Sequence, residues 1–101
     1  MRKPLIAIVF ALMATHSNAA TSFGAYDCGQ WFSQNNSARI WLLGYLSGLA
    51  AADSVSKIDV LDRLNSADQA YVWMDNYCKA NPLKKINNGA ISLYLELQSQ
   101  K

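Results

Sequence analysis

Few side chains in this sequence are of the kinds that carry out catalysis, and their spacing limits what they can do. Asp75 and Asn76 are adjacent, but neighbours on a helix do not face each other, and no second carboxylate stands three or four positions from Asp75. Asp59 and Asp62 are three apart and would present two carboxylates to a cation or to water. We expect a hydrogen bond to backbone for the first pair and a solvated surface for the second.

Residues 1–19 have the layout of a secretory signal peptide. Arg2 and Lys3 form a positive start, residues 5–13 are an apolar run, and small residues close the segment. The apolar run is shorter than the ~20 residues that a membrane-spanning helix needs. We therefore expect export to the periplasm with cleavage after Ala19, and no stable insertion in the membrane afterwards.

Cleavage would leave residues 20–101 as a single domain and would change its chemistry. His16, the only histidine, would be lost, which excludes a Ser–His–Asp triad, a Cys–His pair and a histidine-bound metal within one chain. Without Arg2 and Lys3, seven basic and seven acidic residues remain, so the side chains carry no net charge that would favour binding to nucleic acid. We expect no enzyme, no cofactor and no metal.

Cys28 and Cys78 are the only cysteines, and both lie in the part expected to be exported. Thiols oxidise in that compartment, and no CxxC motif or neighbouring histidine indicates a reactive thiol. We expect one disulfide between them. In the chain-entropy treatment, a disulfide that closes a loop of this length stabilises the folded state by roughly 4 kcal/mol. A domain of this size needs such additional stabilisation.

The apolar pattern predicts an all-α fold, a small bundle of four to five short helices held by the disulfide. The expected helices are 26–32, 39–52, 59–64, 66–80 and 83–98.

The segment 39–52 is apolar on nearly every face, which predicts the central buried helix of the bundle. Gly44 and Gly48 share one side of it, and we expect a neighbouring helix to approach closely there. Ser66 and Gln69 have the spacing of a capping box at the start of the following long helix.

The aromatic residues of the long helices and of the first segment suggest either a ligand-stacking surface or a packed core. Because several stand inside the strongest apolar stretches, we expect the core, which contains Trp31, Trp41, Tyr45, Trp73 and Tyr77.

Two motifs and their order resemble a known group of proteins. The chain has Gly-Tyr-Leu-Ser-Gly at 44–48 and Trp-Met-Asp-Asn-Tyr-Cys-Lys-Ala-Asn-Pro at 73–82, after an export signal and an early cysteine. This arrangement resembles the small periplasmic HdeA/HdeB-type proteins, and it is similar to the Tai-type immunity proteins of type VI secretion. Asp75, Asn76 and Pro82 belong to the most specific part of the motif.

The resemblance implies four or five short helices, one disulfide and a function in binding other proteins. It leaves several partners open: a dedicated exported toxin, a component of plasmid transfer, or acid-denatured periplasmic proteins bound by a chaperone. The chain has no charged tails of the kind that help acid chaperones keep clients soluble. We therefore expect a periplasmic protein-binding module, with immunity, plasmid-accessory and chaperone functions as alternatives and a homodimer left open.

Overall fold

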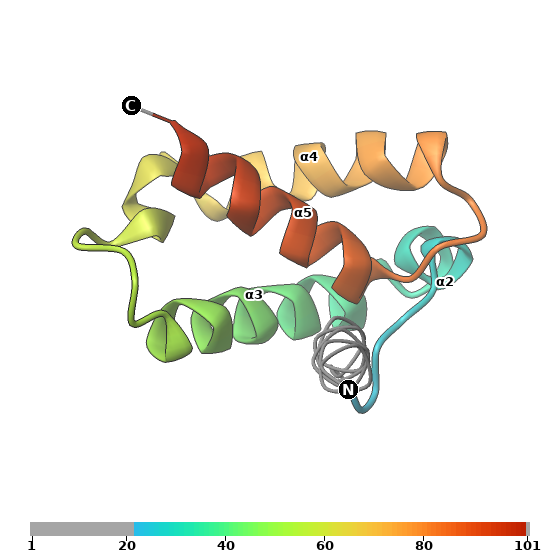
Figure 1. Ribbon diagram of the computed structural model, residues 1–101. Helices are drawn as coiled ribbons and strands as arrows, with labels where there is room; N and C mark the ends of the chain where they lie inside the picture. Colours follow the sequence, from blue (N-terminus) through green and yellow to red (C-terminus); the bar gives the residue numbers. More distant parts are fainter. Residues whose placement is uncertain (1–21, 101) are drawn as a thin grey trace, which may run out of the picture.

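The structure is a computed structural model that describes residues 22–100, and this part of the chain is all-α (Figure 1). The expected signal peptide lies outside the described residues. Within residues 22–100, four α-helices and one 3-10 helix follow one another: α2 (Cys28–Ser33), α3 (Asn35–Ala52), η1 (Val60–Arg63), α4 (Ala67–Ala80) and α5 (Ile86–Ser99).

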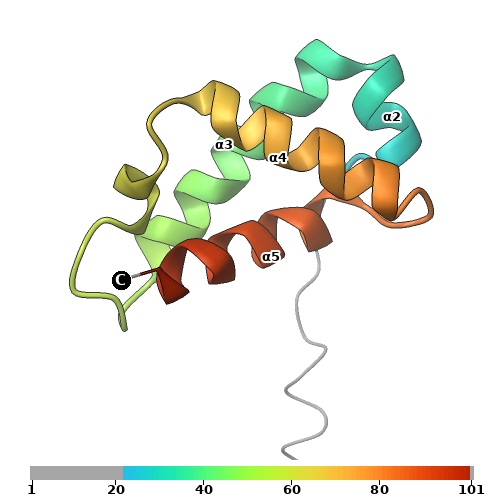
Figure 2. The ribbon, with the colours of Figure 1, turned by 90° about the horizontal axis from the view of Figure 1, so that it is seen from above.

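Two views show how the helices are arranged (Figures 1 and 2). α5 packs against α3, α4 and η1, while α2 packs against α3 and α4. The loop that joins α4 to α5 lies beside α2 at one end of the molecule, and residues 53–66 form the other end. No helix among the described residues is long and apolar enough to cross a membrane.

The most deeply buried helix is α5, so the expectation that 39–52 would be the central helix is wrong. α5 buries the residues expected from their spacing, which are Ile86, Ala90, Leu93 and Leu97. It also buries Gly89 and Tyr94. α3 buries only the stripe Ala38, Leu42 and Leu46. No other described helix packs on its opposite side, where residues 22–24 contact Trp41 and the Ile40 side chain is 74% exposed. The apolar residues on all sides of α3 therefore include exposed ones and do not mean that the whole helix is buried.

Ser66 is the N-cap of α4 as expected, but the side-chain bonds at the helix starts differ from the expected ones. Asp27 caps α2: its carboxylate accepts the Gln30 amide at 2.7 Å, and the Gln30 side chain accepts the Asp27 amide at 3.0 Å. This is a capping box, whereas the one expected at Ser66 does not form. The Gln69 side chain instead accepts the Asn65 amide, one residue before Ser66, at 3.0 Å.

The disulfide joins α2 to the end of α4, as the sequence predicts. Cys28 and Cys78 are both buried. Backbone bonds extend this link to the start of α5, because the Cys28 amide donates to the Lys84 carbonyl and the Ile86 amide donates to the Tyr26 carbonyl, both at 2.9 Å. Three elements are thus tied together at one end of the bundle.

The expected core aromatics divide into two groups. Trp31 is fully buried, whereas Trp41, Tyr45, Trp73 and Tyr77 are only partly buried and pack against the outside of the core. Trp41 stacks on Tyr45 with ring centroids 4.8 Å apart, and Trp73 stacks on Tyr77 at 5.4 Å. The tryptophans therefore pack with separate tyrosines and do not form one ligand-stacking surface.

The glycine pair of α3 does not serve helix packing, which corrects the expectation for Gly44 and Gly48. Apart from the adjoining residues and the nearby backbone of α3 itself, no atom of the described chain lies within 4 Å of a Cβ built at either position. The close approach occurs at Gly89 of α5, where such a Cβ would lie 2.7 Å from Met74 Sδ and 2.8 Å from Tyr77 Cδ2. A side chain at residue 89 would therefore require Met74 and Tyr77 of α4 to move.

Candidate binding groove

The described surface carries several exposed large apolar side chains, and two of them border a common hollow. They are Val55, which is 84% exposed, and Leu95, which is 57% exposed. The hollow is an open groove of about 300 Å³ between α3 and α5. The remaining exposed apolar side chains do not line it: Phe23, Phe32, Ile40, Ile58, Val72 and Leu83.

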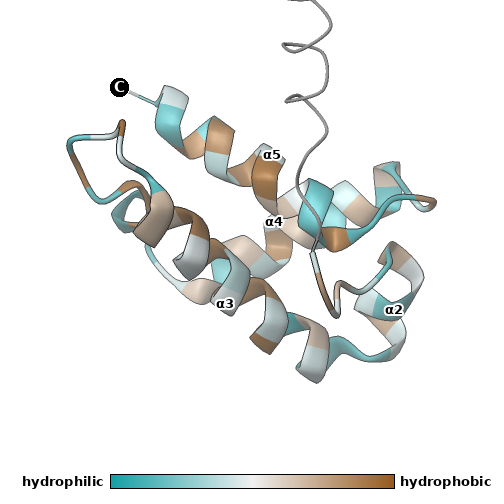
Figure 3. Ribbon diagram, turned by 60° about the horizontal axis from the view of Figure 1, so that its bottom comes forward, coloured by the Kyte–Doolittle hydropathy of each residue, from teal (hydrophilic) through white to brown (hydrophobic). Residues whose placement is uncertain are grey.

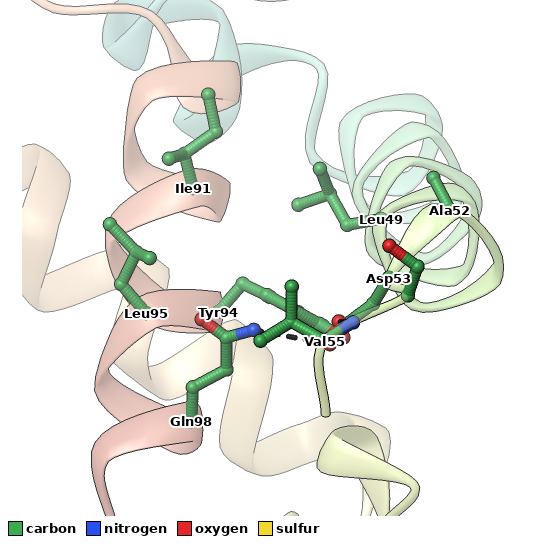
Figure 4. Close-up of a pocket in the computed structure, with 9 residues that line it drawn as sticks. Leu49, Ala52, Asp53, Val55, Ile91, Tyr94, Leu95 and Gln98 are labelled. Atoms are coloured by element: carbon green, nitrogen blue, oxygen red, sulfur yellow. Dashed lines mark hydrogen bonds between the residues drawn. The ribbon is translucent and has the colours of Figure 1, made fainter. Parts of the chain in front are cut away.

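Three segments build the groove (Figure 4). The C-terminal turn of α3 and the loop after it form one side, and α5 forms the other. The lining residues are Leu49, Ala52, Asp53, Ser54, Val55, Ile91, Tyr94, Leu95 and Gln98. Figure 3 shows the C-terminal part of α3 mainly in white and brown, which fits the absence of charged residues from Ile40 to Ala52.

Asp53 sets the geometry of the groove because it ends α3 and fastens the following loop. Its Oδ1 accepts the amides of Val55 and Ser56, both at 2.9 Å, which turns the chain away from the helix axis. Its Oδ2 accepts the Tyr94 hydroxyl at 2.7 Å and the Gln98 side-chain amide at 3.1 Å. One carboxylate thus holds the loop against α5 and fixes the separation of the two walls.

These hydrogen bonds also determine how the site titrates. Donors from the Ser56 hydroxyl and amide, the Tyr94 hydroxyl and the Val55 amide hold the pKa of Asp53 well below its ordinary value. Burial and the hydrogen bond to Asp53 raise the pKa of Tyr94 to about 12. At neutral pH the groove therefore contains a carboxylate anion and a neutral phenol.

Asp53 is poorly placed for proton transfer. The Val55 and Ser56 amides, the Tyr94 hydroxyl and the Gln98 side-chain amide occupy its acceptor positions, so its oxygens are not free to take a proton from a substrate. Among the described residues no group of three or more His, Cys, Asp or Glu side chains is placed to hold a metal.

The remaining polar residues singled out in the sequence lie elsewhere. Asp75 accepts the indole N–H of the buried Trp31 at 2.7 Å, so the expectation of a backbone partner is wrong. Asn76 and Pro82 are exposed. Asp59 and Asp62 are exposed as expected, and Asp59 caps η1 by accepting the Leu61 amide at 3.2 Å.

Sequence reasoning missed the groove, although two signals for it were present. Ile91 and Leu95 are apolar, four residues apart and outside the buried face of α5, so they form a second apolar stripe. Asp53 directly follows a long apolar segment and precedes two serines in the next three positions, which is typical of a turn held by an aspartate side chain.

Comparisons of the chain with protein-family models, curated proteins and solved structures find no match.

Proposed function

We propose that this protein is an exported, non-catalytic protein-binding module of HdeA-like fold, and that the groove between α3 and α5 holds the partner. The observation that carries the proposal is the exposure of Val55 and Leu95 on a groove whose walls are apolar. Exposed apolar side chains gathered around one concave surface are typical of sites that another molecule covers.

The proposed location is the periplasm. The pattern of residues 1–19 supports it, and a disulfide between Cys28 and Cys78 is compatible with an oxidising compartment. Cell fractionation followed by mass spectrometry tests this directly. A protein recovered from the cytoplasm with residues 1–19 attached would refute export.

The partner class is proposed with alternatives. An immunity or plasmid-accessory protein would bind one dedicated exported protein, whereas an acid chaperone would open at low pH and bind many. The bonds from the Asp53 carboxylate to the loop and to α5 favour the first group, because they hold the two walls of the groove together in the folded protein. We expect the groove to keep its form at neutral and mildly acidic pH, where this carboxylate is ionised.

A titration from about pH 7 to about pH 2 separates these roles when near-UV circular dichroism and binding of an apolar dye are followed together. A protein that remains folded and does not bind dye agrees with a dedicated partner. Loss of the near-UV signal with strong dye binding around pH 3 would support the chaperone and contradict our preferred role.

The groove itself is tested by capture of proteins from a periplasmic extract. Val55→Gln places an uncharged polar side chain in the groove without touching a buried residue. Val72→Gln is the matched control, because Val72 is a 58% exposed valine on α4 that does not line the groove. We expect the first variant to lose a captured partner and the second to keep it. Equal retention by both variants would place the binding surface elsewhere.

A further inference from the structure

The charge on the lining of the groove is negative only. Asp53 is the one charged side chain among the described residues that line it, and the rest are apolar or neutral. Its carboxylate is stabilised by neutral donors from Val55, Ser56, Tyr94 and Gln98 and not by a cation. Neutral donors satisfy the oxygens but do not cancel the charge, so the groove keeps a net negative charge.

The position of Asp53 strengthens this negative potential. It is the C-cap of α3, and the C-terminus of a helix carries a partial negative charge. A cation is the favourable neighbour at such a position, yet the last turn of α3 contains no basic residue. An anion and the negative end of a helix therefore point at the same surface.

The nearby cations lie outside the groove. Arg63 donates to the carbonyls of Leu97 and Gln98 at the C-terminus of α5 and does not line the groove. Lys57 lies in the exposed loop and does not line the groove. Asp59 adds a further negative charge that acts on Tyr94.

We infer that the groove takes an apolar segment of another protein that carries a Lys or Arg side chain directly beside its apolar residues. The apolar walls supply the area to be buried, and the charge of Asp53 with the end of α3 selects a positive neighbour. A second copy of this chain fits less well, because a symmetric pair across the groove would bring two Asp53 carboxylates together. This inference rests on the proposed protein-binding function and specifies the chemistry of its partner.

The test uses two short amphipathic peptides of Leu and Ala that differ in one feature: Lys residues flank the apolar face in one and Glu residues in the other. Binding to the purified protein is measured by calorimetry, and NMR chemical shifts locate it. We expect the Lys peptide to shift the amides around Val55 and Leu95 and to bind about two- to fivefold more tightly than the Glu peptide. The preference should disappear in about 1 M NaCl, where surface charges are screened, while the apolar contribution to binding persists.

Two variants test whether the preference for the Lys peptide arises from the charge in the groove. Asp53→Asn should remove the preference, but it also weakens the loop. Leu95→Lys is therefore the second variant: it adds a cation at the rim, leaves the Asp53 bonds intact and should reverse the preference. Val72→Lys on α4 is its control and should leave the preference unchanged.

The outcomes separate the two proposals. Equal binding of both peptides at the groove in low salt would overturn the inferred charge preference but leave the binding function standing. Binding of neither peptide at the groove would count against the groove as a binding surface. A preference that Leu95→Lys leaves unchanged would show that the charge is read elsewhere on the molecule and would also overturn the inference.

Discussion

Replacing three glycines by alanine, one at a time, tests the packing of this bundle, because we expect two of the changes to raise the stability and one to lower it. Gly44 and Gly48 of α3 have free space where a Cβ would be placed, whereas at Gly89 of α5 that Cβ would meet Met74 and Tyr77. All three lie inside helices and gain the same intrinsic preference for alanine. Any difference in the outcome therefore reports the neighbours and not the backbone.

The expected magnitudes follow from two competing effects. Alanine is better than glycine in a helix interior by about 0.5–1 kcal/mol, which should appear in full at Gly44 and at Gly48. At Gly89 the added methyl would lie 2.7 Å from Met74 Sδ, inside van der Waals contact. Met74 is fully buried and has little room to move, so overpacking of about 1–3 kcal/mol should exceed the gain.

Thermal unfolding followed by far-UV circular dichroism measures these differences. For a domain of this size 1 kcal/mol corresponds to roughly 4–8 °C in the midpoint. We expect Gly44→Ala and Gly48→Ala to unfold at higher temperature than the wild type and Gly89→Ala at lower temperature. A lower midpoint for Gly44→Ala would mean that another part of the molecule covers this face of α3. A higher midpoint for Gly89→Ala would refute the close packing of α4 on α5.

Three further predictions concern titration and the disulfide. The fold lowers the pKa of Asp53, so the ionised carboxylate stabilises the protein fully above its ordinary pKa of 3.8, and this stabilisation is lost as the pH falls further below that value. The difference in urea midpoint between the wild type and Asp53→Asn should therefore become smaller in acid. A difference that stays constant with pH would contradict this. The pKa of Tyr94 is raised to about 12, so the stability that its neutral form provides should fall as the pH rises from 10.0 towards that value, and Tyr94→Phe should remove a late phase from the ultraviolet titration of the tyrosines. Cys28→Ala should cost about 2–5 kcal/mol in urea unfolding, and an unchanged midpoint would show that the link to Cys78 does not restrain the unfolded chain.

Much of the local structure can be predicted from neighbouring residues along the chain. Pro82 predicts the end of α4, which stops at Ala80, and the spacing of Ile86 and Leu93 predicts the buried face of α5. These features depend on the backbone and on the few residues around each position, so their chemistry is readable along the chain. The pairing of two cysteines follows from there being only two.

Other features depended on which elements become neighbours. The apolar segment 39–52 predicts a central helix, but only the assembled bundle decides that α5 takes this place and that no other described helix packs on one side of α3. The role expected of Gly44 belongs instead to Gly89, because close approach requires a second helix and not only a residue without a side chain.

The groove is the clearest case of a feature set by tertiary structure. Its two walls come from residues 49–55 and 91–98, which are far apart in the chain; α3 and α5 pack together in the core, and Tyr94 and Gln98 donate to Asp53 across the groove. Helix propensity and periodicity act over a few residues and predict each wall separately. Whether Leu95 is covered or exposed depends on what packs beside it, and that is decided only when the whole bundle assembles.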